Sequence, residues 1–330
     1  MTVERCTGKE WIVLKILVYG DVMLDCYYWG EATRISPEAP VPVVNLEEVT
    51  YALGGAANVA ANVSSLSGPN DECILMGVAG KDHEATVLSS MLRDNGITDY
   101  LAFERDRVTT VKARIVAGGQ HMLRLDNEDT GPLYNKSANA LRSRMNQVVG
   151  DCRAIIISDY AKGAVSEQMA VDIIRLGIAN EIPVFVDPKG NDWSKYASAF
   201  CVTPNRKEFI EYYNTNYNAE ISTDEEIAIV APEIAGQFNW THLCVTLGDR
   251  GIMVADDVEA YFYPAEEVEV ADVSGAGDTV IAAFAVDAAG IEDPLTVDMM
   301  YAAIFANRAA ALAVSKLGTV AVPYYEVEYD

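Results

Sequence analysis

The sequence is short of basic residues, because 24 lysines and arginines stand against 49 aspartates and glutamates in 330 residues. A protein that binds duplex nucleic acid needs a basic surface, so the formal net charge of −25 argues against a nucleic-acid partner. No uncharged apolar run is long enough to span a bilayer, and residues 1–10 lack the charged-then-apolar layout of a signal peptide. The composition therefore predicts a cytoplasmic protein without membrane partners.

Cysteine and histidine are also scarce and scattered. No two cysteines form a C-x-x-C pair, and His83, His121 and His242 have no metal-ligand spacing. We therefore expect neither a disulfide framework nor a histidine-based metal centre. The cysteines are predicted to be small buried side chains in a reducing compartment; they are Cys6, Cys26, Cys73, Cys152, Cys201 and Cys244.

Two common nucleotide-binding fingerprints are missing. A nicotinamide oxidoreductase should carry G-x-G-x-x-G after its first strand, but residues 20–23 read GDVM. A P-loop needs serine or threonine after its Gly-Lys pair, but Asp82 follows Gly80 and Lys81. Any nucleotide chemistry must therefore use another kind of loop.

Short apolar runs rich in β-branched residues alternate with segments of helical periodicity such as 166–178. Strand alternating with helix predicts a parallel α/β sheet. The unbroken apolar character of 155–157 is typical of a strand buried on both faces. The predicted strands are 16–19, 74–76, 154–157, 184–186, 243–247 and 252–254.

Two stretches break this alternation. Residues 27–52 are rich in proline and turn residues, and 109–125 have the pattern of a hairpin around Gly118 and Gly119. Long loops without structure are uncommon, so both stretches are predicted to form a small β subdomain beside the main sheet, although ordinary loops are the alternative. A tight turn at these glycines would place Lys112 and Arg114 on one face and Arg124 on the other.

The strongest local signal for chemistry lies at 270–280, VADVSGAGDTV. A strand-like run at 268–270 leads into a glycine turn, and an apolar helical segment follows at 280–289. The free N–H groups of a first helical turn bind anions and can stabilise a transferring phosphoryl group. An aspartate there, Asp278, can accept a proton from a hydroxyl, whereas its alternative role is a helix N-cap.

Residues 274–278, SGAGD, resemble the catalytic signature of the ribokinase (PfkB) carbohydrate-kinase family. Other landmarks of that family are resembled in the same order along the chain, at 54–58 (GGAAN), 77–82 (GVAGKD), 205–208 (NRKE) and 246–251 (TLGDRG). The resemblance implies one domain over residues 1–330, with an α/β/α sandwich and a small β-sheet lid formed by about 27–52 and 109–125. It also implies an ATP-dependent phosphotransferase that uses Mg²⁺.

Further motifs resemble one branch of that family, the D-glycero-β-D-manno-heptose 7-phosphate kinases, which phosphorylate the anomeric O1. They lie at 20–25, 34–43, 158–163, 186–190 and 316–319, whereas Ala85 stands where the family often has glycine. The branch can be fused to a nucleotidylyltransferase, and this sequence resembles only the kinase half. Another sugar, sugar phosphate or nucleoside as acceptor, and a non-catalytic sugar- or nucleotide-binding protein, are the alternatives.

The resemblance also implies roles for single residues. Asp278 would be the general base, with Gly275, Ala276 and Gly277 supplying anion-binding amides. Substrate binding falls to Asp25, Arg34, Gly54, Gly55, Asn58, Lys112, Arg124, Lys162 and Lys189. Nucleotide binding falls to Asn205, Thr246, Gly248, Gly251 and Asn307, and Asn205 and Glu208 would act on Mg²⁺ through water.

Some of these roles have structural alternatives. Asn205 and Glu208 fit a helix capping box, and Gly248 and Gly251 fit a plain hairpin turn. The exposed edges of lid strands predict a homodimer through the lid. Members of the wider family are activated by a monovalent cation, and the sequence leaves that dependence open.

Overall fold

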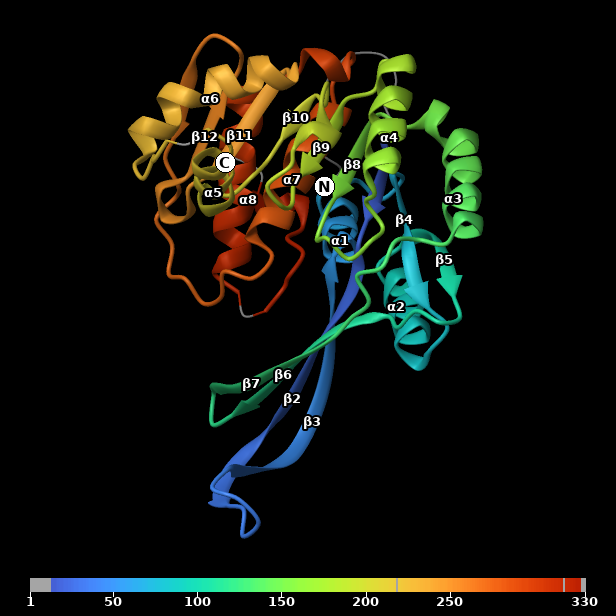
Figure 1. The fold of residues 1–330 in the computed structure, drawn as a ribbon, viewed down its shortest axis with the longest axis vertical. Coiled ribbons are helices and arrows are strands. Elements are labelled where there is room, and N and C mark those ends of the chain that lie inside the picture. The colour runs from blue at the N-terminus through green and yellow to red at the C-terminus, as the bar shows by residue number, and fades with distance from the viewer. Residues whose placement is uncertain (1–12, 218, 317, 328–330) are drawn as a thin grey trace.

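A computed structural model describes residues 13–217, 219–316 and 318–327 and shows a sandwich from which a long β arm projects (Figure 1). The described strands form a nine-stranded sheet, in the order β13-β12-β11-β10-β9-β8-β1-β4-β5, and a four-stranded sheet, in the order β3-β2-β6-β7. The larger sheet consists of β1 (Lys15–Gly20), β4 (Glu72–Gly80), β5 (Ile97–Glu104), β8 (Ala154–Ser158), β9 (Val184–Asp187), β10 (Cys201–Val202), β11 (His242–Thr246), β12 (Ile252–Ala255) and β13 (Ala260–Tyr263).

Alternate side chains of the central strands enter two separate cores. In β1, Ile16 and Val18 pack on one face of the sheet, and Leu17 and Tyr19 pack on the other. This follows from the period of two in a strand, and it explains why β8 is buried throughout and apolar up to Ser158. The first core includes helices α1 (Ala56–Leu66), α2 (His83–Asp94), α7 (Ala276–Ala289), α8 (Met299–Val314) and α9 (Tyr324–Val327); the second includes α3 (Asn135–Val148), α4 (Glu167–Ala179), α5 (Arg206–Asn216) and α6 (Asp224–Phe238).

The predicted alternation of strand and helix is confirmed, with two differences. All six predicted strands occur in the larger sheet, but β12 and β13 run antiparallel at its edge. The strand predicted at 268–270 is wrong, because this segment has no strand partner and Val270 is exposed. The backbone after it bonds to a helix instead, since the amides of Ala271 and Asp272 both donate to the carbonyl of Val314.

The smaller sheet forms the arm seen in Figure 1 and contains the segments predicted as a lid. Its strands are β2 (Val22–Ile35), β3 (Pro42–Gly55), β6 (Thr110–Ala117) and β7 (Gln120–Asn127). Only Asp21 separates β1 from β2, so the arm continues directly from the centre of the main sheet. The arm is therefore rooted at the carboxyl ends of the parallel strands, where ligands bind in open α/β sheets.

A β-bulge changes one prediction about this arm. The register of β6 and β7 shifts between Ile115 and Val116, so that Arg114 pairs directly with Arg124. Direct cross-strand partners project from the same face of a sheet, and an extra residue in one strand reverses the faces beyond it. The prediction that Arg124 lies on the face opposite Arg114 is therefore wrong.

Five of the cysteines are buried and free, as predicted; Cys6 lies outside the described residues. Among the helices in the described part of the chain, none combines the length and the apolar character needed to cross a membrane.

Candidate functional site

The site is centred on Asp278 in the first turn of α7. The helix begins after Gly275, whose φ of +81° is left-handed, and no side chain caps its N-terminus. Asp278 is therefore not an N-cap, and that alternative is excluded. A Cβ on Gly275 would lie 2.7 Å from Asn58 Nδ2, so the turn needs glycine for close approach as well as for its backbone conformation.

Two neutral donors hold the buried carboxylate of Asp278. Tyr160 donates its hydroxyl to Oδ1 at 2.7 Å, and Asn58 donates Nδ2 to Oδ2 at 2.7 Å. Burial raises the pKa of Asp278 to about 6, against the opposing effect of these two hydrogen bonds. A carboxyl group with such a pKa is ionised at neutral pH and is still basic enough to accept a proton.

Behind Asn58, a buried polar chain runs between α1 and α7. Thr279 donates to Asn62 Oδ1 at 3.0 Å, and Asn62 donates to the Asn58 carbonyl at 2.9 Å. All three side chains are buried, so each hydrogen bond avoids leaving a polar group unpaired. These hydrogen bonds fix Asn58, a predicted sugar-binding residue, against Asp278.

The loop after β8 brings Tyr160 to the site. Asp21, at the start of the arm, accepts the backbone amides of Tyr160 and Lys162 on Oδ2 and that of Ala164 on Oδ1, at 2.8 to 3.0 Å. Asp159 accepts hydrogen bonds from Lys195 and Tyr196 at 2.6 Å. Sequence analysis missed Asp21 and Tyr160 as functional residues, although the motifs at 20–25 and 158–163 contain them.

On the arm side of the site, Asp25 and the glycine pair of β3 lie close together. Asp25 Oδ1 lies 2.5 Å from Arg114 Nη1. A Cβ on Gly54 would lie 2.8 Å from Met23 Cγ and 3.1 Å from Asp25 Oδ2, so glycine allows the close packing around this buried carboxylate. Gly55 has a left-handed φ of +54° and turns the chain into α1. These predicted sugar-binding residues are therefore adjacent, beside Asp278, whose pKa the charge of Asp25 also raises.

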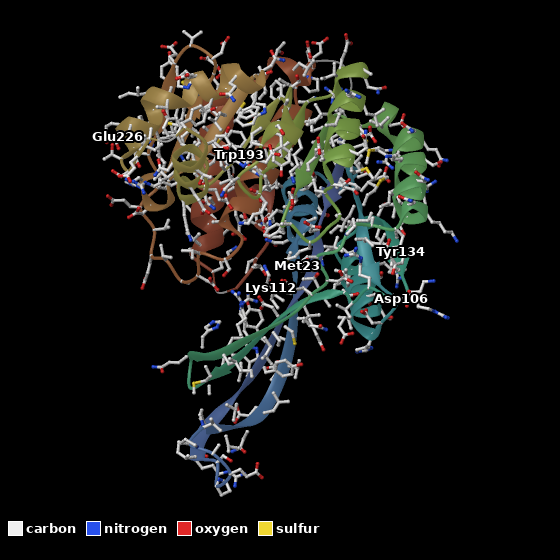
Figure 2. All side chains as sticks on the ribbon, in the orientation of Figure 1. Met23, Asp106, Lys112, Tyr134, Trp193 and Glu226 are labelled. Atoms are coloured by element: carbon white, nitrogen blue, oxygen red, sulfur yellow. The ribbon has the colours of Figure 1, made fainter. Side chains whose placement is uncertain are left out.

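The basic residues predicted to bind the substrate differ in their partners. Lys162 is paired with Glu128 at 2.7 Å, Lys189 with Glu208 at 2.7 Å, and Arg124 with Asp126 at 2.9 Å. Lys112 instead has its ammonium group 5.4 Å from the centroid of the Tyr160 ring, where the arm meets the body (Figure 2). Within the described residues, its ammonium group forms no ion pair with a carboxylate.

Arg34 lies apart from the other predicted site residues. It is exposed in the outer half of β2, about 30 Å farther along the strand than Asp25 at the usual rise per residue. Arg34 therefore cannot hold a sugar beside Asp25 and Asp278 of its own chain, and its predicted substrate role is wrong for a site within one chain. The distinctive proline-rich motif that suggested this role occupies the tip of the arm.

On the predicted nucleotide side, the structural alternative for Asn205 and Glu208 is confirmed. The two residues form a complete capping box at the start of α5, and Asn205 also bridges to Thr246. Gly248 and Gly251 lie in the connection between antiparallel strands β11 and β12, so the hairpin interpretation is confirmed. A Cβ on Gly251 would lie 2.1 Å from the carbonyl oxygen of Tyr263. Asn307 donates to the carbonyls of Tyr263 and Pro264, and so supports the same region.

Asp187, at the carboxyl end of β9, is a site residue that sequence analysis did not single out. Burial raises its pKa well above the ordinary value, and the charges of Asp278 and Glu208 add to this rise. Asp187, Asp278 and Glu208 therefore share one region of the site, where the charge of Lys189 opposes theirs. No cluster of histidine, cysteine, aspartate and glutamate within the described residues is sufficient to hold a metal ion alone, so Mg²⁺ would keep water and phosphate oxygens as ligands.

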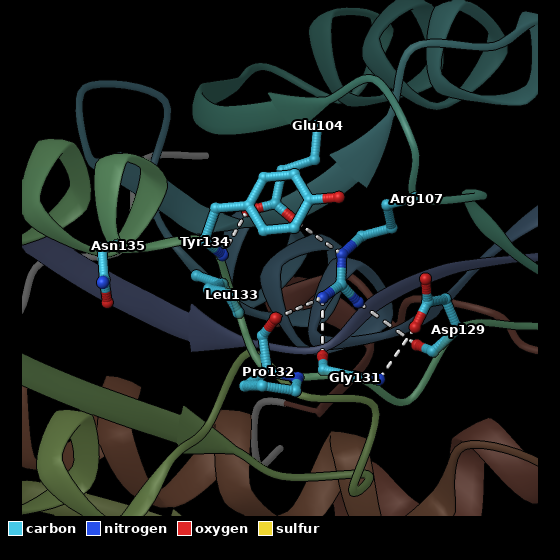
Figure 3. Close-up of a pocket in the computed structure, with 8 residues that line it drawn as sticks. All are labelled: Glu104, Arg107, Asp129, Gly131, Pro132, Leu133, Tyr134 and Asn135. Carbon is cyan, nitrogen blue, oxygen red and sulfur yellow. Dashed lines mark hydrogen bonds and ion pairs between the residues drawn. The ribbon is translucent and has the colours of Figure 1, made fainter.

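A surface pocket at the root of the arm has a structural role (Figure 3). Arg107 is buried there and donates to Glu104 Oε2 at 3.0 Å. Its other nitrogens donate to the carbonyls of Asp129, Gly131, Pro132 and Lys162. All N–H donors of its guanidinium group are used in these hydrogen bonds, which leaves none for a ligand. Arg107 therefore connects the Tyr160 loop to the segments that flank β6 and β7.

Comparisons with known proteins agree with this geometry. The family described as pfkB family carbohydrate kinase matches residues 13–324. "Bifunctional protein HldE" from Methylobacillus flagellatus is 41% identical over 318 residues, which cover 96% of this chain and 62% of the relative. The protein of the same name from Coxiella burnetii is 41% identical over 312 residues, which cover 94% of this chain and 62% of the relative. The chain therefore spans somewhat less than two thirds of the length of these relatives.

Solved structures share the fold at low sequence identity. Phosphofructokinase-2 from Escherichia coli in complex with potassium matches with a TM-score of 0.77 and 19% identity, over 96% of this chain and 97% of that chain. Ribokinase from Arabidopsis thaliana complexed with ribose and ATP matches with a TM-score of 0.73 and 19% identity, over 96% of this chain and 100% of that chain. The α/β/α sandwich with a projecting β-sheet predicted from the sequence is confirmed.

Proposed function

The chain belongs to the pfkB family of carbohydrate kinases, and from that premise we propose that it phosphorylates the anomeric O1 hydroxyl of D-glycero-β-D-manno-heptose 7-phosphate with MgATP. The product is the 1,7-bisphosphate, on the route to ADP-heptose. The observation that carries the proposal is the buried Asp278, held by two donors with a pKa of about 6 beside Asp25 and the glycine pair. The motifs that resemble the heptose 7-phosphate kinase branch support this choice of acceptor over other sugars.

In this reaction Asp278 acts as the general base. It accepts the proton of the O1 hydroxyl while O1 bonds to the γ-phosphorus of ATP. The bond from that phosphorus to the β,γ-bridging oxygen breaks, and ADP leaves with the electron pair. The amides of Gly275, Ala276 and Gly277 lie at the start of α7, where N–H groups can stabilise the developing charge; the amide of Ala276 also donates a long hydrogen bond of 3.4 Å to the Val273 carbonyl.

Mg²⁺ neutralises charge on the phosphate oxygens when it is bound. Glu208 and Asn205 would hold it through water, in a region where Asp187 adds a further carboxyl group. The neighbouring residues Thr246, Gly248 and Gly251 lie on the same side and would border the nucleotide, with Asn307 supporting the strand beside them.

Lys112 is the strongest candidate for the phosphate that the substrate already carries. Its pKa is lowered chiefly by burial. The charges of Lys162 and Arg114 lower it further and those of Asp25 and Asp126 raise it, so the three cations share one region with two carboxylates. A phosphate bound there would reduce the repulsion among the three cations. It would also give Lys112 an anionic partner. Lys162 is the second candidate for binding the substrate phosphate, since its ion pair with Glu128 leaves other N–H donors of its ammonium group available.

We also propose that the protein works in the cytoplasm as a homodimer joined through the arm. Five free buried cysteines suit a reducing compartment. The arm exposes large apolar side chains, among them Ile35, Leu46, Leu123 and Leu125, which a second arm would cover. Sedimentation over a range of protein concentrations tests the dimer, and a monomer at every concentration would contradict it.

The decisive experiment measures ADP release with MgATP against a panel of sugars and sugar phosphates, with Asp278→Asn in parallel. Loss of a general base should lower kcat by about 10²–10⁴-fold. Fast turnover of heptose 7-phosphate alone supports the proposal, and a different preferred acceptor would overturn the choice of substrate. If no acceptor turns over, a binding protein replaces the kinase. Repeating the assay in potassium and in sodium salts tests for a monovalent cation.

A further inference from the structure

Tyr160 contacts the proposed base but has no part in the mechanism above. Its hydroxyl lies 2.7 Å from Asp278 Oδ1, although 118 residues separate the two in the sequence. Its backbone is fixed independently, because its amide donates to Asp21 and the next residue, Ala161, has a left-handed φ of +56°. A non-glycine residue in that conformation is strained unless the structure around it holds it in place.

The two donors on Asp278 come from different parts of the fold and divide its oxygens between them. Asn58, on α1, takes Oδ2, while Tyr160, after β8, takes Oδ1. Each oxygen can still accept a second hydrogen bond, so both donors leave a lone pair for a sugar hydroxyl. Together they fix the plane of the carboxylate, because a rotation about its last bond would break at least one of them.

We propose that Tyr160 is a positioning residue for phosphoryl transfer, whose hydroxyl orients the Asp278 carboxylate and stabilises its ionised form. This inference rests on the proposed function, since it assigns a task within the same reaction. Tyr160 is not itself a catalytic residue, because it acts through Asp278. Its ring has a second task, because it carries the ammonium group of Lys112 on its face.

The charged groups around Asp278 agree with this task. Burial raises the pKa of Asp278, and so does the charge of Asp25 on β2. The hydrogen bonds from Asn58 and Tyr160 lower this pKa, as does the charge of Lys112 on β6. Asp187, on β9, is a further acidic neighbour. The pKa of Tyr160 itself lies well above its ordinary value, chiefly because of burial and the charge of Asp278, so its hydroxyl remains a donor throughout the working pH range.

The test compares Tyr160→Phe with Tyr196→Phe. Phenylalanine keeps the ring under Lys112 and removes only the hydroxyl. Tyr196 is the matched control, because it is also buried and also donates its hydroxyl to an aspartate, Asp159, which does not contact Asp278. A hydrogen bond to a charged group corresponds to roughly 10- to 100-fold in rate, or about one to two pH units in the midpoint of a titration.

We expect Tyr160→Phe to lower kcat at pH 7 by about 10- to 100-fold, to leave KM for the sugar within about twofold, and to move the acidic limb of the kcat profile upward by about one pH unit or more. Tyr196→Phe should leave the acidic limb where it is. Replacing Tyr160 by 4-aminophenylalanine, which keeps a donor at the same place on the ring, should restore most of kcat.

A readout without turnover separates this inference from the proposed function. The ¹³C signal of the Asp278 carboxyl group, assigned by its absence in Asp278→Asn, should titrate at higher pH in Tyr160→Phe than in the parent chain. An unchanged titration in a folded Tyr160→Phe would overturn the inference, whatever the enzyme assay shows. A changed KM with unchanged kcat and acidic limb would overturn it as well, because Tyr160 would then bind the sugar. A shifted titration in a chain without kinase activity would support the contact and reject the function.

Discussion

Asn58 Nδ2 lies 2.7 Å from Asp278 Oδ2, across 220 residues of sequence. The glycine motif at the start of α1 and the glycine turn at the start of α7 therefore meet at one carboxylate. A family resemblance assigns the first motif to the sugar and the second to catalysis, but the structure joins them through this hydrogen bond. Under the proposed function, this hydrogen bond would couple substrate binding to the protonation state of the base.

The buried carboxylate of Asp278 should cost stability at neutral pH. Its pKa rises from 3.8 to about 6 on folding, which corresponds to at most about 3 kcal/mol. A raised carboxyl pKa favours the folded state below pH 4, and this advantage is lost as the pH rises through 6. Asp278→Asn should therefore unfold at a higher temperature than the parent at pH 8, and the difference should shrink towards pH 4. Thermal unfolding followed by circular dichroism measures both.

Asp272 provides a control of opposite sign. Burial raises its pKa, but hydrogen bonds from Ser274 and Gly318 outweigh burial and lower the pKa overall. Asp272→Asn should therefore lose stability at pH 8, and the loss should fade on acidification. If Asp278→Asn and Asp272→Asn change the unfolding temperature at pH 8 in the same direction, the opposite pKa shifts of the two carboxyl groups are contradicted.

Removal of Arg107 should destabilise the root of the arm. Arg107→Met leaves Glu104 buried without its partner and frees four carbonyls, which should cost about 3–5 kcal/mol of unfolding free energy. Arg142→Met breaks the half-exposed pair with Asp172 and should cost about 1 kcal/mol or less. Urea unfolding compares the two, and equal losses would show that Arg107 has no special structural role.

Loss of the Lys112 charge should affect phosphorylated acceptors selectively. Lys112→Met removes the ammonium group that has no carboxylate partner, so KM for a sugar phosphate should rise by about 10- to 100-fold. KM for the unphosphorylated sugar should change much less. Lys136→Met, an exposed change on α3, controls for net charge. An equal rise in both KM values would show that Lys112 does not bind the substrate phosphate.

Glu208 and Glu226 offer a matched pair for the metal proposal, because each completes a capping box. Glutamine can fill the same position in such a box, so both Glu→Gln variants should keep nearly the parental unfolding temperature. Only Glu208→Gln should raise the Mg²⁺ concentration needed for half-maximal activity, by about tenfold. If Glu226→Gln raises this Mg²⁺ concentration equally, then Glu208 only caps α5 and has no separate role at the metal.

Local patterns in the sequence were enough to locate the base and the strands. The glycine turn before an apolar segment predicted the start of α7 with Asp278 in its first turn, and the apolar runs predicted the central strands. The strand at 268–270 was predicted by the same reasoning and is wrong. Its alternating valines and glutamates match a strand pattern, but a strand also needs a neighbour to accept its hydrogen bonds, and that is a property of the whole fold.

Contacts between distant segments could not be predicted in this way. The hydrogen bond from Tyr160 to Asp278 and the ion pair of Lys162 with Glu128 depend on how α7, the loop after β8 and the segment after β7 pack together. The β-bulge in the hairpin is a single-residue change of register without a clear mark in the sequence, and it moved Arg124 to the other face. A basic residue in a distinctive motif was a poor guide to its distance from the site, as Arg34 shows.

The three amides held by Asp21 have a consequence for the order of folding. They lie 139 to 143 residues from it in the sequence, so the Tyr160 loop closes only after β1 and β8 have paired. Closing such a long segment is slow relative to local structure, and the Tyr160 loop is then among the last parts to become ordered. Once formed, its amide protons should exchange with solvent only when the central sheet opens, which makes them reporters of global unfolding.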